Sequence, residues 1–155
     1  MLGGWQISGI FSAVSGQPFQ LTASGASLNA VDQTQTPDQV GSAKKLGGVG
    51  SGNPFYDPSA FVPVTDVRYG TVGRNSLLGP GAVNFDFSLF RTFKPLERLE
   101  VQFRVDAANL FNTPHFNNPS DAGTSTTSIT SGDFLTIISA RNDERQFRFG
   151  LRLAF

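Results

Sequence analysis

The chain has 155 residues, with 12 basic and 12 acidic side chains and no cysteine. This length suits one ordinary domain, the balanced charge argues against a nucleic-acid-binding surface, and the lack of cysteine excludes a disulfide framework or a thiolate metal site. Charged residues make up only 15% of the chain and 15 residues are phenylalanine, which is typical of a turn-rich β-protein that buries aromatic side chains or exposes them to lipid.

The first residues show no export signal. No apolar run approaches the ~20 residues of a membrane-spanning helix, and the start has neither a basic n-region nor an apolar h-region. If the protein reaches an outer membrane, its signal lies elsewhere, so we expect the chain to be a fragment.

The first segment with strand character covers residues 5–15, where side chains alternate loosely between two faces until Gly16-Gln17-Pro18 ends the pattern. Residues from about 20 to 80 are irregular, with one weak strand expected between Ala60 and Val72. A structureless stretch of this size is unusual inside a compact domain, so it predicts a functional loop region or an unrecognised element.

The clearest pattern is a hairpin. Residues 82–93 and 99–108 alternate between apolar and polar side chains, and Lys94-Pro95-Leu96-Glu97-Arg98 lies between them as a turn. Further along, residues 134–140 predict a short apolar strand, 141–144 a charged turn and 145–155 a final strand. The sequence therefore predicts an all-β fold of about five or six antiparallel strands.

The two faces of these strands differ in a way that favours a membrane. One face carries rows of Phe, Leu and Val, whereas the other carries charges at mid-strand. The charged positions are Asp86, Glu100, Arg104, Asp106, Arg148 and Arg152. In an outer-membrane barrel the apolar face meets lipid and the polar face meets a wet lumen, and strands of about ten residues cross the bilayer at a tilt. Arg91 falls on the apolar parity, which either snorkelling at the strand end or a bulge would explain.

The end of the chain carries the most specific signal. Apolar residues occupy alternate positions up to the terminus, at Phe147, Phe149, Leu151, Leu153 and Phe155. This pattern is similar to the C-terminal signature of outer-membrane barrel proteins, which the barrel-assembly machinery recognises. The competing interpretation is a buried terminal strand of a soluble protein.

Several stretches resemble the C-terminal barrel region of TonB-dependent outer-membrane receptors, particularly acidobacterial members with a carboxypeptidase-regulatory-like N-terminal domain. These stretches are Gly4-Trp5-Gln6-Ile7-Ser8-Gly9-Ile10-Phe11, Ser15-Gly16-Gln17-Pro18-Phe19, Asp57-Pro58-Ser59-Ala60-Phe61, Gly73-Arg74-Asn75-Ser76-Leu77, Gly79-Pro80-Gly81, Asn109-Leu110-Phe111-Asn112 and Arg145-Gln146-Phe147. They span nearly the whole chain, so residues 1–155 are identified as a C-terminal barrel segment with a long irregular loop region at about 20–80.

The resemblance implies a barrel of about 22 strands whose lumen is plugged by an N-terminal domain. Contact with the energy-transducing TonB protein would be made only through N-terminal parts that this chain lacks. The last strand would descend to a periplasmic C-terminus. On that basis we expect residues 141–144 and 94–98 to be extracellular and residues 109–112 to be periplasmic.

No residue stands out as a catalytic, cofactor-binding or metal-binding candidate, so we expect neither an enzyme nor a cofactor. His115 is the only histidine and has no Cys or second His as a metal-binding partner. The run Gly48-x-Gly50-x-Gly52 lacks the strand and helix of a phosphate-binding loop, and the mid-strand carboxylates fit lumen-lining ion pairs better than an acid/base pair. If any region contacts a ligand, we expect it to be the extracellular loops.

Three hypotheses follow from the sequence. The leading one is a structural part of a TonB-dependent transporter in the outer membrane of a Gram-negative bacterium, in contact with lipid and with the barrel-assembly machinery. The second is a self-contained small outer-membrane barrel or adhesin, which needs about three more strands within residues 20–80. The third is a soluble secreted β-sandwich that binds glycans, whose rows of Phe would be interior.

Overall fold

The computed structural model describes residues 4–30, 32–119, 126–141 and 144–155, and its strands pair antiparallel, as predicted. The chain divides into two compact units. We call Met1–Val14, Ala82–His115 and Asn142–Phe155 the sheet unit, and Ser15–Gly81 and Phe116–Arg141 the loop unit. Within the described ranges, no helix has the length and apolar character that a membrane crossing requires.

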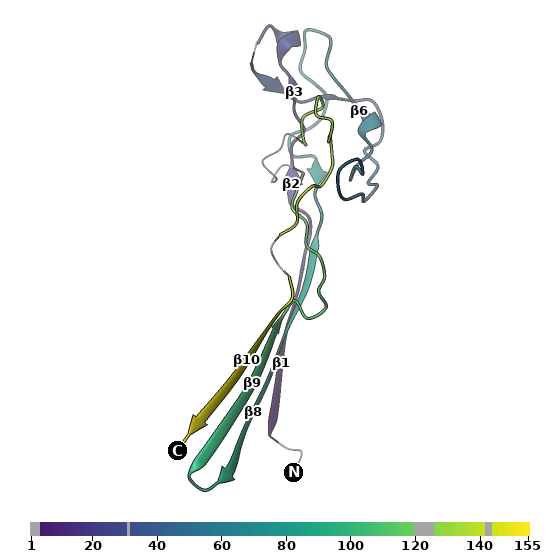
Figure 1. Cartoon of the computed structure of the whole chain (residues 1–155). Helices are drawn as coiled ribbons and strands as arrows, with labels where there is room; N and C mark the ends of the chain where they lie inside the picture. The colour runs from purple at the N-terminus through teal and green to yellow at the C-terminus, as the bar shows by residue number, and fades with distance from the viewer. Residues whose placement is uncertain (1–3, 31, 120–125, 142–143) are drawn as a thin grey trace. The chain divides into compact units, whose positions relative to one another are not determined.

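The sheet unit is a four-stranded sheet in the order β1-β8-β9-β10 (Figure 1). Its strands are β1 (Trp5–Val14), β8 (Ala82–Leu96), β9 (Leu99–Ala108) and β10 (Gln146–Ala154). They agree closely with the strands predicted at 5–15, 82–93, 99–108 and 145–155, because period-two alternation of apolar and polar side chains is a strong local signal. The register shifts between Phe93 and Leu96, where β8 continues into the segment predicted as a turn.

The two ends of the sheet differ in their connections. At the hairpin end, Leu96 pairs with Leu99 and Ala154 pairs with Glu100, so β10 finishes beside the short β8–β9 turn. At the loop end, Val14 pairs with Ala82 and Ala108 with Gln146, so both long connections leave the sheet there.

The topology expected for residues 94–112 is wrong. The segments 109–112 and 141–144 were placed on opposite sides of the membrane, but the Arg145 amide donates to Asn112 Oδ1 at 3.3 Å, at the loop end. Residues 94–98 were placed opposite the C-terminus, yet they lie at the same hairpin end as Ala154. Residues 142 and 143 of the predicted charged turn lie outside the described residues.

The cause of that error is the strand predicted at 134–140. These residues form a turn and isolated bridges in the loop unit, where Leu135 and Ile137 are fully buried. An apolar run of this length does not distinguish a strand from a buried irregular segment. The described residues consequently hold four long strands in one sheet, where five or six were expected.

The loop unit, predicted to be mostly irregular, has little regular structure but a core of its own. Its elements are β2 (Pro18–Phe19), β3 (Ala23–Ser24), η1 (Ala26–Leu28), β4 (Thr34–Gln35), β5 (Asp38–Gln39), η2 (Pro58–Ala60), β6 (Phe61–Val62) and β7 (Leu77–Leu78). The strands form three pairs, β2-β7, β3-β4 and β5-β6. The weak strand expected between Ala60 and Val72 is present only as β6.

A close backbone contact follows the end of β1. A Cβ on Gly16 would lie 1.9 Å from the carbonyl oxygen of Gly79, so a larger residue at position 16 would collide with the Gly79 backbone. The Gly79 amide donates to the Gln17 carbonyl oxygen at 2.9 Å. The segment that leaves β1 and the segment that enters β8 therefore run close together at Gly16 and Gly79, where side chains would not fit.

Candidate functional site

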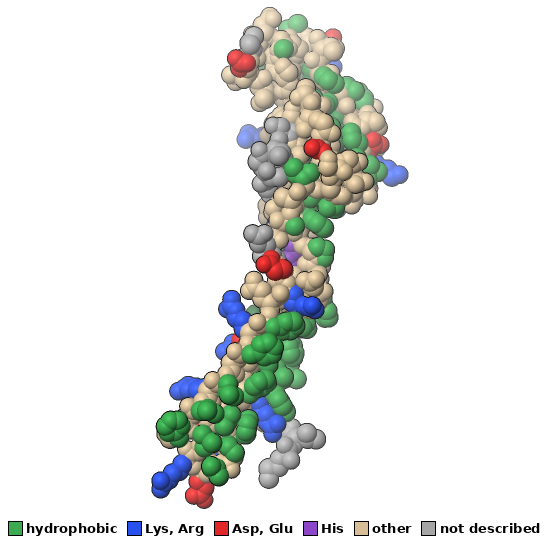
Figure 2. Space-filling model, viewed as in Figure 1, with side chains coloured by type: hydrophobic (Ala, Val, Ile, Leu, Met, Phe, Trp, Pro, Cys, Tyr) green, Lys and Arg blue, Asp and Glu red, His purple; other side chains and the backbone are tan. Residues whose placement is uncertain are grey.

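The sheet has one continuous apolar face. The register joins Ile7 to Leu89, Leu89 to Val105 and Val105 to Phe149, and the same parity holds along all four strands. Many of these apolar side chains are exposed, and Figure 2 shows hydrophobic side chains gathered over the strands. The sheet therefore presents an uncovered apolar face, as expected of a lipid-facing wall and not of a sandwich core.

Arg91 is on this apolar face, and the structure selects between the two explanations for it. Arg91 pairs in regular register with Trp5 and Phe103, and the shift in the ladder comes only after Phe93. A bulge therefore does not account for its parity. Its guanidinium carbon lies 4.9 Å from the centre of the Trp5 ring and 5.7 Å from that of Phe93.

The opposite face carries polar networks. Ser8, Ser88, Asp106 and Arg148 form one cross-strand row, and Ser88 Oγ donates to Asp106 at 2.5 Å. The Arg104 guanidinium lies 2.8 Å from the same carboxylate. Lumen-lining ion pairs were predicted, and this one is made by two residues of the same strand, β9.

The other two predicted carboxylates have different partners. Asp86 accepts hydrogen bonds from the Asn84 side chain and the Asn109 amide, both at 2.9 Å, so it holds the loop end of the sheet together. Glu100 lies 3.7 Å from Lys94 across the hairpin. Neither arrangement brings two carboxylates together as an acid/base pair.

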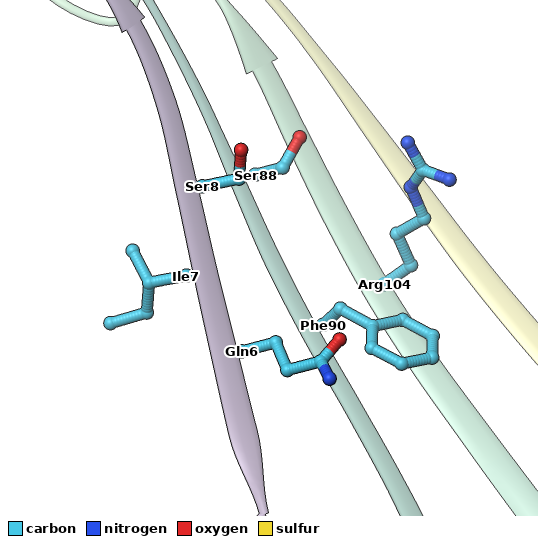
Figure 3. A pocket seen from close by; sticks show the side chains of 6 residues that line it. All are labelled: Gln6, Ile7, Ser8, Ser88, Phe90 and Arg104. Atoms are coloured by element: carbon cyan, nitrogen blue, oxygen red, sulfur yellow. The ribbon is translucent and has the colours of Figure 1, made fainter.

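A shallow hollow of about 510 Å³ lies on the polar face. It is lined by Gln6, Ile7, Ser8, Ser88, Phe90 and Arg104 (Figure 3). The figure shows the Ile7 side chain pointing to the other side of β1 from Gln6, as strand alternation requires. Phe90 is an aromatic side chain within an otherwise polar row, beside Gln6 and Arg104.

Both outer strands of the sheet have one free edge among the described residues, since β1 pairs only with β8 and β10 only with β9. The smallest outer-membrane barrels have about eight strands, so four cannot close a barrel. An exposed strand edge templates pairing with another strand. The sheet thus needs further strands on both sides to make a membrane wall.

The predicted C-terminal signature lies at one of these edges. Phe147, Phe149, Leu151 and Leu153 belong to β10 and point to the apolar face, opposite Ala107, Val105, Phe103 and Val101. All four are exposed, and so is Phe155, which follows the strand. The alternation and exposure of these side chains agree with the predicted apolar pattern.

The core of the loop unit joins segments that lie far apart in the sequence. Its buried members are Phe19, Leu21, Phe55, Tyr56, Ala60, Phe61, Val72, Leu77, Phe134, Leu135 and Ile137. The Phe55 amide donates to the Leu135 carbonyl oxygen and the Gly50 amide to that of Ile137, each at 2.8 Å. Both long connections of the sheet therefore fold into one unit.

Sequence reasoning missed this core. Its aromatic residues are separated by runs of Gly, Pro and polar residues, so no period of two or 3.6 is present. The one available signal was the number of large apolar residues in a region that otherwise resembles a loop, since a disordered stretch has few of them.

An ion pair between Arg68 and Asp38 fixes part of the loop unit, and the Asp38 side chain is 10% exposed whereas that of Arg68 is 45% exposed. Arg68 donates to both carboxylate oxygens of Asp38 at 2.7 Å, and the Thr71 amide donates to Asp38 at 3.1 Å. The hydrogen bonds from Arg68 hold the pKa of the Asp38 carboxyl below its ordinary value, and the same pairing raises the pKa of Arg68. This bidentate pair ties β5 to the segment around residue 70.

Next to this pair, two large apolar side chains point outward. Val67 and Tyr69 flank Arg68 in the sequence and are both strongly exposed. Elsewhere on the loop unit, a groove of about 460 Å³ is lined by Gly52, Pro54, Pro58, Phe61, Pro63, Ile129, Ser131, Gly132, Phe134 and Thr136. Exposed apolar groups on a folded loop are common features of recognition surfaces.

His115 has a structural position. It is buried, and its Nε2 lies 2.9 Å from the carbonyl oxygen of Val83 at the start of β8. In the part of the chain that the structure describes, no three His, Cys, Asp or Glu side chains gather as metal ligands would. The run Gly48-x-Gly50-x-Gly52 lies in a turn of the loop unit, with positive φ at Gly50 and Gly52.

The chain matches a model of a known protein family. The family model described as an outer membrane beta barrel domain matches residues 1–148. Searches of curated proteins and of solved structures found no match.

Proposed function

Because this chain belongs to the outer membrane beta barrel domain family, we propose that its sheet forms part of a TonB-dependent receptor, which takes up a scarce nutrient such as a siderophore or glycan. Membership of the family points to the outer membrane of a Gram-negative bacterium. The finer assignment to a TonB-dependent receptor is supported by the sequence stretches that resemble that family. In this proposal the residues of the chain build wall and loops and carry out no catalysis.

The observation that carries the proposal is the open, two-faced sheet. Its four strands have an exposed apolar face, a polar face with cross-strand networks, and free edges on β1 and β10. These features fit four neighbouring strands of a larger barrel with a wet lumen. The proposed orientation places the hairpin end in the periplasm, since outer-membrane barrels have short periplasmic turns and long extracellular loops.

The loop unit would then be extracellular, where it would be the first part to meet a nutrient. Its own core and the Asp38–Arg68 pair give it a defined shape. We assign recognition of the nutrient to this unit, since loops fixed on a rigid scaffold commonly carry binding.

Two alternatives have less support. A small self-contained barrel of about eight strands needs about four spanning strands besides the four of the sheet, and the described part of residues 20–80 holds only two-residue strands. A soluble sandwich needs its rows of Phe inside, but Phe11, Phe93, Phe147 and Phe149 are exposed.

The deciding experiment is to sequence the DNA upstream of the Met1 codon. We expect an in-frame continuation that encodes further alternating strands, a plug domain and a segment for TonB contact. A stop codon and a ribosome-binding site immediately before Met1 would contradict the proposal. If the continuation is present, deletion of the gene and deletion of the TonB gene should abolish growth on the same limiting nutrient.

A further inference from the structure

We propose that Arg104, Arg148 and Arg152 bind the carboxylate of a small organic anion on the polar face of the sheet, with the body of that anion against Phe90. The inference rests on the proposed function, since it takes the polar face as the wall of a wet lumen. It adds to that function the chemical class of a solute that this wall binds.

The first step is the arrangement of the three arginines. Arg104 pairs with Gly150 across β9 and β10, and Arg148 and Arg152 lie two residues to either side of Gly150. Residues two apart in a strand point to the same face, and diagonal neighbours on paired strands are within reach of long side chains. The three guanidiniums can therefore approach one point above Gly150.

The second step is the surplus of positive charge. Asp106 lies opposite Arg148, and its carboxylate is 2.8 Å from Arg104. Asp86 and Glu100, on the same face, have other partners. Three arginines therefore share the single carboxylate of Asp106, which leaves this part of the polar face with an excess of positive charge. Such an excess is complementary to an anion.

The third step is the set of donors that remain. Arg104 is held to Asp106 through Nε, which lies 3.0 and 2.8 Å from the two carboxylate oxygens. Among the described residues, the Nη1 and Nη2 atoms of Arg104 and the guanidiniums of Arg148 and Arg152 have no hydrogen-bond partner. All three arginines are exposed on the surface of the sheet. Guanidinium edges of this kind form strong, often bidentate hydrogen bonds to carboxylates.

The fourth step is the space above Gly150. A Cβ at this position would lie 3.7 Å from the Arg104 Cβ, an ordinary van der Waals distance, so packing within the sheet does not require glycine. The register of β9 and β10 is regular, so Gly150 does not mark a bulge. A glycine inside a strand often marks a place where a ligand approaches closely. Gly150 leaves the floor between the three guanidiniums open.

The fifth step is the body of the anion. The hollow beside Arg104 has a volume of about 510 Å³, within the range of ~300–1,000 Å³ that is usual for small-molecule sites. Phe90 lies in the same cross-strand row as Arg104 and offers an apolar surface, while Gln6, Ser8 and Ser88 supply polar groups around it (Figure 3). An inorganic anion would make no use of the ring. A carboxylate carried on an apolar body satisfies both the arginines and Phe90.

The test uses the protein extracted from outer membranes in a non-ionic detergent, with binding followed by fluorine NMR. The probe is para-fluorobenzoate. One matched control is para-fluorobenzamide, which keeps the ring but has no charge, and the other is fluoroacetate, which keeps the carboxylate but has no ring. We expect saturable binding of the probe and roughly tenfold weaker binding of each control.

Two results with these compounds would overturn the proposal. One is binding of either control as tight as that of para-fluorobenzoate. The other is the absence of saturable binding, which is also the result expected if acidic side chains from another segment already occupy the three arginines.

Three variants sharpen the result. Arg104→Gln should bind para-fluorobenzoate roughly tenfold more weakly, as expected for the loss of charge-assisted hydrogen bonds. Gly150→Leu keeps all three charges but fills the space between them, so it should weaken binding by a similar factor. Arg98→Gln removes a cation from the hairpin turn and should leave binding unchanged. Affinities of Arg104→Gln and Gly150→Leu equal to that of the unmodified protein would contradict the proposed site.

A mapping experiment works on the unmodified protein, so it does not depend on recovery of any variant. The photoreactive analogue para-azidobenzoate should label peptides containing Phe90 or Arg104, and an excess of para-fluorobenzoate should prevent this labelling. Labelling confined to other parts of the protein would overturn the proposal. These measurements need neither TonB nor growth on a nutrient, so failure of the anion site is distinguishable from failure of the proposed receptor, which the upstream DNA sequence decides.

Discussion

Asp38 is a carboxylate that the loop unit encloses. Its side chain is 10% exposed, whereas Asp66, which lies 3.5 Å from the same Arg68, is 72% exposed. Because hydrogen bonds from Arg68 lower the pKa of Asp38, the charged form favours the folded state above the unfolded pKa of about 3.9. That stabilisation is lost as the pH falls through the lowered folded pKa.

We therefore expect the loop unit to lose backbone protection as the pH falls below about 4. Hydrogen exchange of residues 36–72, corrected for the intrinsic effect of pH, measures this loss. Asp38→Asn should weaken protection already at neutral pH and remove most of the acid sensitivity, and Asp66→Asn should change neither. An unchanged pH profile in Asp38→Asn would show that another group controls the transition.

At the scale of the element, the two faces of β1 give a matched pair of substitutions. Ile7 lies in the row of Leu89, Val105 and Phe149 near the middle of the apolar band, and Gln6 is its neighbour on the polar face. We expect Ile7→Lys to destabilise the membrane-inserted protein by about 2–4 kcal/mol, while Gln6→Lys should be nearly neutral. Denaturant unfolding from phospholipid vesicles measures both, and equal effects would mean that the apolar face does not meet lipid.

The last strand supports a second prediction at this scale. Phe155 is fully exposed and ends the alternating series of β10. If this series is a recognition signal for barrel assembly, Phe155→Ala should reduce the amount of protein in the outer membrane several-fold without altering its synthesis. Immunoblots of membrane fractions measure the amount, and Arg152→Gln on the polar face of β10 is the control. Normal levels of Phe155→Ala would leave the signature without a role.

The sheet elements also show what a sequence can predict. The limits of β1, β9 and β10 agree with the sequence within one residue at each end, because every residue from Leu99 to Ala108 follows one local period. The strand predicted at 134–140 was wrong because burial in an irregular core produces the same apolar run as a strand. The position of Arg91 on the apolar face could be explained only with the structure. A bulge would shift the pairing register at Arg91, whereas snorkelling would leave the register regular.

At the scale of the whole molecule, most of the missing information is long-range. The loop unit is formed by residues 15–81 together with 116–141. The hydrogen bond between Phe55 and Leu135 joins these two segments, which lie far apart in the sequence. Such pairings depend on the complete fold and leave no local pattern. The candidate surface was therefore predictable for the sheet, where faces follow alternation, and was not predictable for the loop unit.

This shared core makes the two long connections depend on each other. Ile137 is fully buried and contributes to the core from the second segment, whereas its neighbour Ile138 is 38% exposed. Truncating a buried isoleucine to alanine costs about 2–5 kcal/mol, through lost burial and the cavity that remains. In a unit with so few regular hydrogen-bonded elements, this loss should loosen the first segment as well as the second.

We therefore expect Ile137→Ala to accelerate proteolytic cleavage within residues 15–81, well away from the substitution in sequence. Limited proteolysis of the extracted protein, with the cut sites mapped by mass spectrometry, provides the measurement. Ile138→Ala removes the same atoms from a partly exposed position and should leave the cleavage pattern close to that of the unmodified protein. If Ile137→Ala were cleaved faster only within 116–141, the two connections would be independent loops. Recognition could then be assigned to either connection alone, because neither would need the other to hold its shape.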